Sequence, residues 1–205
     1  MADYKFVLVA VLKGNAVDAS AHKDVEIVEV TMIIVNKEEN TIDHSQFHSY
    51  VKPAIQPKLD EKCKELNHVY QFTIDEAEPW PKVEERTNKW LRERGLNSRQ
   101  ENFILATDGQ NGFEKILKSQ CRINNSQIPE WAQRWVDIRH EFKTAYKASE
   151  HVDRLDVQKM GQIAGLSLDG SRKGSGRDEA FDLATIVLSL LRREHAFEHS
   201  SKLSA

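Results

Sequence analysis

The sequence predicts an α/β domain built around a mixed sheet. Two apolar runs of strand length lie near the start of the chain, at Tyr4–Leu12 and Val25–Asn36, and a third candidate strand, Ile42–Val51, follows a polar turn. From Pro53 onward, helical and strand patterns alternate, which is typical of α/β proteins. We therefore expect one sheet of about five strands, near the average for sheets, with helices flanking it.

The later elements are bounded by proline, by glycine and by changes in the hydrophobic period. Pro81 favours a helix start before Val83–Arg94, and Gly95 ends that helix. The last helix is predicted most directly, because apolar residues recur at helical spacing from Leu183 to Leu191. The other expected elements are helices at Leu59–Leu66, Gly112–Cys121, Arg139–Tyr146 and Leu155–Ala164, and strands at Phe103–Thr107 and Trp135–Ile138. We expect one domain over residues 1–194 and a frayed tail over residues 195–205.

Composition excludes several classes of protein. The 205 residues are 40% hydrophobic and 30% charged, as in globular domains. With 29 Lys and Arg against 32 Asp and Glu, the net charge of −3 does not indicate an obligate polyanion binder. No apolar run approaches the roughly 18 residues of a membrane helix, and Phe6–Leu12 is too short for a secretory leader. Cys63 and Cys121 lack metal or disulfide spacing, so we expect an intracellular protein, cytoplasmic or nuclear.

Five short phrases in a fixed order carry a family resemblance. They are Glu26–Glu29, Phe47–Pro53, Thr107–Gly109, Gln120–Cys121 and Arg134–Arg139. With these phrases in this order, the chain resembles the ERI-1-like 3′→5′ exonucleases of the DEDDh superfamily from about Tyr4 to Arg193. The resemblance implies a ribonuclease-H-like exonuclease fold.

The chemistry of that family requires four carboxylates that hold two divalent ions, and a histidine that activates water. By the resemblance, the first two carboxylate positions fall on Ala10 and Leu12, and the third falls on Gly112. The histidine position falls on Gly174, and only the fourth carboxylate position keeps an acid, Glu179. One carboxylate cannot hold two hard cations. We therefore expect a degenerate member without catalytic residues, without the two magnesium ions and without another cofactor.

The predicted function is a pseudonuclease that acts as a protein-interaction scaffold or an RNA-associated adaptor in RNA processing or silencing. Its partners would be proteins of such a complex, with RNA as a further candidate. One alternative is a metal-independent RNA-binding module that uses the former catalytic cleft. Its candidate RNA contacts are Lys13, Arg172, Lys173 and Arg177. Basic side chains among glycines and serines can hold phosphate, although a solvated loop without a specific role has the same composition.

A second alternative is a weak 3′→5′ exonuclease that uses Glu179, Asp178 and a substitute histidine. The candidate histidines are His48, His68, His140 and His151. They are scattered over different elements, so surface or core roles are the favoured interpretation. For Glu26 and Glu29, structural hydrogen bonds are likewise favoured over catalysis, because a catalytic dyad needs a matched acid and base.

Tryptophans and arginines near residue 135 suggest a base-stacking strip. Trp131 and Trp135, close to Arg134 and Arg139, could stack on bases. Because Trp135 lies within a family-like phrase, we expect it in the core and expect Trp131 to be the freer of the two. Trp80, between two prolines, is expected to anchor the packing of its connection.

Overall fold

The structure is a computed structural model that describes residues 4–15, 24–96, 102–149, 151–168, 174–197 and 201–202. Its strands are β1 (Phe6–Gly14), β2 (Ile27–Asn36), β3 (Thr41–Ile42), β4 (Phe47–Lys52), β5 (Glu78–Pro79), β6 (Phe103–Thr107), β7 (Arg134–Asp137) and β8 (Ser201–Lys202). Its α-helices are α1 (Glu61–Asn67), α2 (Gln71–Asp75), α3 (Trp80–Glu93), α4 (Gln110–Ile123), α5 (Ile138–Tyr146), α6 (Val157–Ala164) and α7 (Gly176–Arg192). Short 3-10 turns lie at Glu130–Ala132 and Val152–Arg154.

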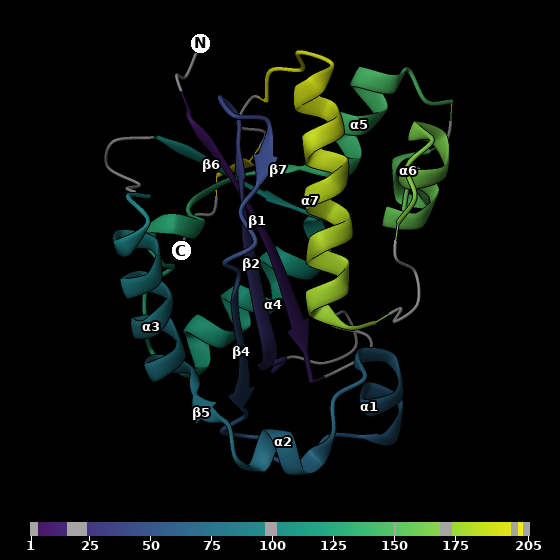
Figure 1. Ribbon diagram of the computed structural model, residues 1–205. Helices are drawn as coiled ribbons and strands as arrows, with labels where there is room; N and C mark the ends of the chain where they lie inside the picture. Colours follow the sequence, from purple (N-terminus) through teal and green to yellow (C-terminus); the bar gives the residue numbers. More distant parts are fainter. Residues whose placement is uncertain are drawn as a thin grey trace.

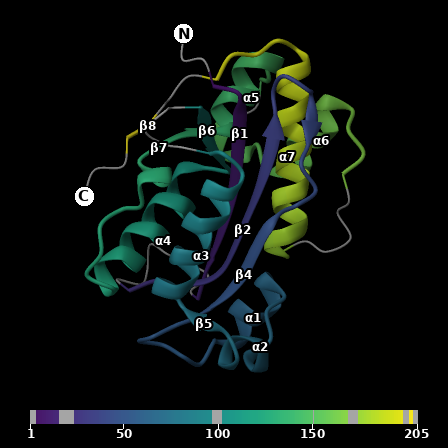
Figure 2. The ribbon, with the colours of Figure 1, turned by 60° about the vertical axis from the view of Figure 1, so that its left-hand side comes forward.

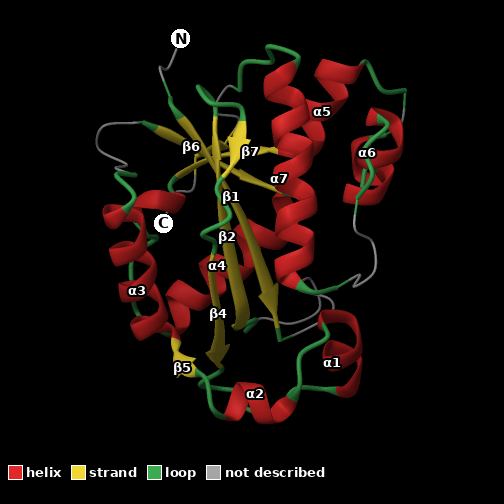
Figure 3. Cartoon of the chain, viewed as in Figure 1, coloured by secondary structure: helices red, strands yellow, loops and turns green. Residues whose placement is uncertain are grey.

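The strands form one mixed sheet between two layers of helices (Figure 1; Figure 3 shows the strands in yellow). Among the described residues the sheet has eight strands, in the order β5-β4-β2-β1-β6-β7-β8, with β3 paired to β2 beside this path. The predicted class, a mixed sheet flanked by helices, is confirmed. The sheet exceeds the expected size because β3, β5 and β8 each have two residues, which is too short to produce a sequence pattern.

The central strand β1 has partners of both directions. It is antiparallel to β2, with Ala10 opposite Met32, and parallel to β6, with Val9 opposite Ala106. Both long strands are buried on both faces, which explains why β1 and β2 read as continuous apolar runs. The carboxyl end of β1 therefore lies beside the start of β2, with Gly14 opposite Ile27, and extends past the last residues paired with β6, Val9 and Ala106.

Side chains of β1 alternate between two cores, one on each face of the sheet. Even positions from Leu8 to Leu12 belong to the core under α3 and α4, and odd positions from Val7 to Val11 belong to the core under α5, α6 and α7. Figure 2 shows these helix groups on opposite sides of the sheet. A third, small core lies beneath α1 and α2. Trp80 is 1% exposed and anchors the first of these cores, as predicted.

Aspartates begin three of the helices. Asp60, Asp137 and Asp156 each accept a hydrogen bond from a backbone N–H in the first turn of α1, α5 and α6. Such caps satisfy donors that a helix start leaves free. An aspartate also divides the expected strand Ile42–Val51, because Asp43 accepts hydrogen bonds from the N–H and hydroxyl of Ser45 and turns the chain between β3 and β4.

The part of the tail that the structure describes differs from the expected frayed end. Phe197 is 4% exposed, and its N–H donates to the Tyr4 hydroxyl at 3.0 Å. His195 Nε2 lies 2.6 Å from Glu141 Oε2, and residues 201–202 pair antiparallel with β7. Residues 198–200 and 203–205 lie outside the description. None of the described helices has the length and apolar character to cross a membrane.

Candidate functional site

An ion pair joins the end of β1 to the first turn of α7. Lys13 Nζ donates a hydrogen bond to Glu179 Oε2. The two side chains are 16% and 27% exposed, so the pair is largely shielded from solvent. Glu179 is the one carboxylate that the resemblance places in a metal position, and the ammonium group of Lys13 supplies the positive charge beside it.

A buried acid, Glu29, holds the start of α7. Glu29 lies opposite Lys13 in the β1–β2 register and is 2% exposed. Its Oε1 is 2.8 Å from His48 Nε2, and its Oε2 accepts a hydrogen bond from the N–H of Gly176 at 3.2 Å. Gly176 is the first residue of α7, where a negative charge is favourable. Glu29 and His48 thus have the structural roles that the sequence favoured.

Glu26 has a similar structural role in the loop after β4. It is fully buried, and its two carboxylate oxygens accept hydrogen bonds from the N–H groups of Ala54, Ile55 and Gln56 at 2.5–3.1 Å. Hydrogen bonds to an ionised acceptor are stronger than neutral ones. Glu26 therefore fixes the backbone that leads into α1.

The position predicted for the general base is closed by the backbone. Gly174 has φ +102°, a conformation that side chains with a Cβ rarely adopt. A Cβ on Gly174 would lie 1.8 Å from the Leu66 carbonyl oxygen, far inside contact distance. This loop can carry a histidine at Gly174 only if the chain moves away from the end of α1.

Beside this site lies a partly buried ion pair between β6 and α5. Arg139 Nε and Nη2 donate to the two carboxylate oxygens of Asp108 at 2.6 and 3.0 Å. Asp137 Oδ1 in turn accepts from the N–H groups of Gly109 and Arg139. Burial raises the pKa of Asp108, the Arg139 guanidinium opposes that rise, and the nearby carboxylates of Glu179 and Asp137 add to it. Asp108 is therefore committed to holding α5 against the sheet.

The described residues do not fit two divalent cations. Ala10 is fully buried and Leu12 is 8% exposed, and both belong to the apolar core under α3 and α4. Gly112 has no side-chain atom that could bind a metal, and the Glu179 carboxylate is paired with Lys13. Within the described ranges, no three His, Cys, Asp or Glu side chains gather as a metal ligand set. Hard cations of this type need several oxygen ligands each.

The candidate RNA contacts are only partly described. Lys13 is paired with Glu179, so its charge is already offset. Arg177 is exposed in the first turn of α7, and with the Gln46 amide oxygen turned toward it, its Nη2 and Nε lie 2.6 and 3.1 Å from that oxygen. Arg172 and Lys173 lie outside the described residues. A shared phosphate site for these four residues stays a prediction.

The base-stacking strip does not form, because both tryptophans belong to the core. Trp135 is 1% exposed, as expected, but Trp131 is only 3% exposed, and the expectation that it is freer is wrong. Both indoles pack near Phe113 of α4. The sequence also gave no sign of the Lys13–Glu179 pair, because 166 residues separate its partners.

Comparison with known proteins identifies the family. Residues 14–161 match the family described as "Exonuclease" (RNase_T). This chain belongs to that exonuclease family. Rat 3′-5′ exoribonuclease 1 is 29% identical over 167 residues, which cover 82% of this chain and 47% of the rat protein. The 3′-5′ exonuclease eri1 of Schizosaccharomyces pombe is 28% identical over 193 residues, 84% of this chain and 63% of the yeast protein. The chain thus spans about half the length of the rat exonuclease that it matches.

Solved exonuclease structures share the fold along nearly the whole chain. The nuclease domain of 3′hExo, a DEDDh family member solved with bound rAMP, superposes with a TM-score of 0.89 at 23% identity and covers 98% of both chains. The cell-death related nuclease 4 gives a TM-score of 0.82 at 21% identity, over 93% of this chain and 64% of that one. The expected exonuclease fold is confirmed, and membership of the exonuclease family agrees with the resemblance found in the sequence.

Proposed function

We propose that this exonuclease-family domain is a pseudonuclease that acts by binding, as a protein scaffold or an RNA-associated adaptor in RNA processing or silencing. The observation that carries the proposal is the Lys13–Glu179 ion pair. An ammonium group bonded to the remaining carboxylate competes with any cation for the same oxygens. A metal at this place would also have to approach a fixed positive charge.

The other catalytic positions support the same proposal. Two-metal hydrolysis needs carboxylates that clamp both ions, together with a base for the attacking water. Ala10 and Leu12 offer hydrocarbon where the resemblance expects oxygen ligands, and Gly174 packs against the Leu66 carbonyl where it expects a histidine. The close-packed cores on both faces of the sheet do not depend on a metal. The fold can therefore persist after the chemistry is lost.

A nuclease assay tests the loss of activity. We expect no shortening of 5′-labelled single-stranded or stem-loop RNA at high concentrations of the full chain with Mg²⁺ or Mn²⁺. Rat 3′-5′ exoribonuclease 1 serves as the positive control. The proposal would be overturned if the native chain and the exposed-site control Glu61→Gln both shorten the RNA and Glu179→Gln does not. Shortening that both variants retain equally would indicate a contaminating nuclease.

RNA binding separates an adaptor from a pure scaffold. A solved relative is described as recognising a histone mRNA stem-loop at its 3′ end, which makes a stem-loop the appropriate probe. An adaptor binds labelled stem-loop RNA in EDTA, with an affinity that falls steeply with salt and that drops in Arg177→Ala but not in Lys82→Ala. Absence of binding at physiological salt would leave the scaffold role alone.

A further inference from the structure

Large exposed hydrophobic side chains gather at one end of the molecule. Of the five that are exposed among the described residues, four lie between Ile55 and Phe72. We call these four the α1–α2 platform: Ile55, Leu66, Tyr70 and Phe72. Figure 1 shows α1 and α2 together at the lower end, away from the main helix layers. The fifth side chain, Phe181, lies on α7 and stacks on His44.

Two aromatic rings form the most exposed part of this platform. Tyr70 and Phe72 are 67% and 69% exposed. Their ring centroids lie 5.7 Å apart with an interplanar angle of 18°, so the rings stack on each other and face water. Rigid aromatic rings, and tyrosine above all, supply much of the contact area in protein recognition sites. An exposed group of apolar side chains of this kind indicates an interaction site.

The backbone under the platform is held firmly. Below it lies the small core of Val28, Leu59, Cys63, Val69 and Ile74. The Gln71 side chain ties the start of α2 to the preceding loop, since its Oε1 accepts from the Leu59 N–H at 2.9 Å and its Nε2 donates to the Pro57 carbonyl at 2.8 Å. Glu26 holds residues 54–56. The rings are therefore presented in a fixed arrangement, which lowers the entropy lost on binding.

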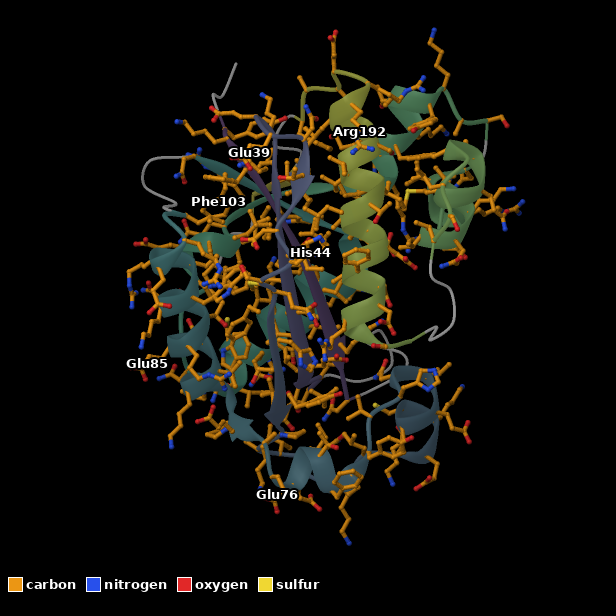
Figure 4. All side chains as sticks on the ribbon, in the orientation of Figure 1. Glu39, His44, Glu76, Glu85, Phe103 and Arg192 are labelled. Atoms are coloured by element: carbon orange, nitrogen blue, oxygen red, sulfur yellow. The ribbon has the colours of Figure 1, made fainter. Side chains whose placement is uncertain are left out.

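The charges around the platform disfavour nucleic acid. Residues 54–76 contain three lysines and five acids, a net charge of −2, and Lys52, whose Nζ donates to the Asp75 carbonyl at the end of α2, reduces the balance to −1. Lys64 is also paired with Glu61, and Glu76 lies at the outer end beside α2 (Figure 4). Platforms that stack nucleobases lie in positively charged grooves, because the phosphate backbone must be neutralised. These negative surroundings instead complement a ligand with lysine or arginine side chains.

The size of the platform limits what can bind. A stable interface between two proteins uses about 20–30 residues a side, whereas the platform offers four large apolar side chains, which favours a small ligand over a dimer of this chain. A small contact area can hold only a ligand that loses little freedom on binding. Proline-containing segments meet this condition, because they are already extended in solution and dock on aromatic-lined surfaces.

We propose that the α1–α2 platform binds a short proline-containing segment of a partner protein that carries lysine or arginine residues. The inference names the partner class for the binding role proposed above and rests on that role. Tyr70 and Phe72 provide the surface for proline rings, and the acidic side chains around them attract the basic residues.

Selection from a phage-displayed library of random short peptides tests the platform. The bait is the full chain, compared with a Tyr70→Ala/Phe72→Ala variant and with Phe181→Ala, which removes an exposed aromatic side chain at another site. We expect the native chain and Phe181→Ala to enrich peptides that contain proline and lysine or arginine. One such peptide, synthesised with a fluorophore, should bind with micromolar Kd in fluorescence polarisation and about tenfold more weakly to the double variant.

Several results would overturn the inference. They are no enrichment, enrichment of peptides without proline or basic residues, and equal affinity for the double variant. Single-stranded RNA binding that the double variant loses would make the platform a base-stacking surface, and a dimer that it disrupts would make the occupant a second copy. Equal urea midpoints for the double variant and the native chain establish that folding is intact. If the chain binds the peptide and also degrades RNA, only the pseudonuclease proposal is overturned. If the chain neither degrades RNA nor binds the peptide, only this inference is overturned.

Discussion

Two regions of this domain differ in whether their side chains find partners within the protein. Near the carboxyl end of β1, acidic side chains contact partners within the protein. Glu179 pairs with Lys13, and Asp108 pairs with Arg139. Glu29 contacts His48 and accepts a hydrogen bond from the start of α7. In the α1–α2 platform, aromatic side chains on a fixed backbone face water without cover from the described residues. In the first region the charges are paired within the protein, and the proposed loss of metal binding rests on that pairing. In the platform the apolar side chains stay exposed, and the proposed peptide site rests on that exposure.

Breaking the Asp108–Arg139 pair should give the largest effect. Asp108→Ala leaves a guanidinium, only 24% exposed, without its bidentate partner. We expect the free energy of unfolding, measured with urea, to fall by about 3–5 kcal/mol. The matched control is Glu114→Ala, which breaks a more exposed pair with Lys118 on one face of α4 and should cost about 0.5 kcal/mol or less. A loss below about 1 kcal/mol for Asp108→Ala would contradict the view that this region depends on internal charge pairing.

Glu26 tests whether the platform depends on a buried acid beneath it, because Glu26 holds the backbone of residues 54–56 without belonging to the platform. Glu26→Ala leaves the N–H groups of residues 54–56 without their acceptor, and we expect a loss of about 2–3 kcal/mol in unfolding free energy. Amide hydrogen exchange at residues 54–56 should speed up, and affinity for the selected peptide should fall although Glu26 is fully buried. Glu26→Gln keeps one acceptor oxygen, so its free energy of unfolding should lie between those of the native chain and Glu26→Ala. Unchanged exchange in Glu26→Ala would show that the loop is held by other contacts.

A smaller effect is expected at the Lys13–Glu179 pair, whose side chains are partly exposed. Lys13→Met leaves the Glu179 carboxylate unpaired near Asp108, whereas Lys13→Met/Glu179→Gln removes both charges. In a double-mutant cycle we expect a coupling energy of about 1–2 kcal/mol, with the double variant more stable than Lys13→Met alone. Mn²⁺ should leave the Tm of the native chain unchanged. Additive losses, or a Tm that rises with Mn²⁺, would mean that the lysine does not satisfy this carboxylate.

Much of the fold was predictable because its signals are local. The doubly buried strands β1 and β2 read as continuous apolar runs, Phe103–Thr107 matches β6 residue for residue, and α7 follows its apolar stripe. The two-residue strands were not predictable, because a pair of residues becomes a strand only through its neighbour in space. The packing of the described tail residues was not predictable for the same reason: Phe197 is buried, and its N–H donates to the hydroxyl of Tyr4, 193 residues away in the sequence.

The candidate site was predictable as a set of positions and not as a set of contacts. The resemblance placed Ala10, Leu12 and Glu179, but nothing local indicates that Lys13 reaches Glu179. Sequence reasoning assigned Lys13 to RNA from its charge and from the place in the former cleft that the resemblance gives it. It also passed over Tyr70 and Phe72, because apolar residues beside a short helix resemble core residues until their exposure is known.

The backbone at Gly174 bears on the evolutionary reversibility of this domain. The Cβ of a histidine introduced there would meet the Leu66 carbonyl oxygen, so we expect that single substitution to lower stability without restoring activity. Restored carboxylates would bring their own cost, since Ala10 and Leu12 pack in an apolar core. Under the pseudonuclease proposal, each single substitution that restores one catalytic side chain is therefore expected to lower stability before hydrolysis can return.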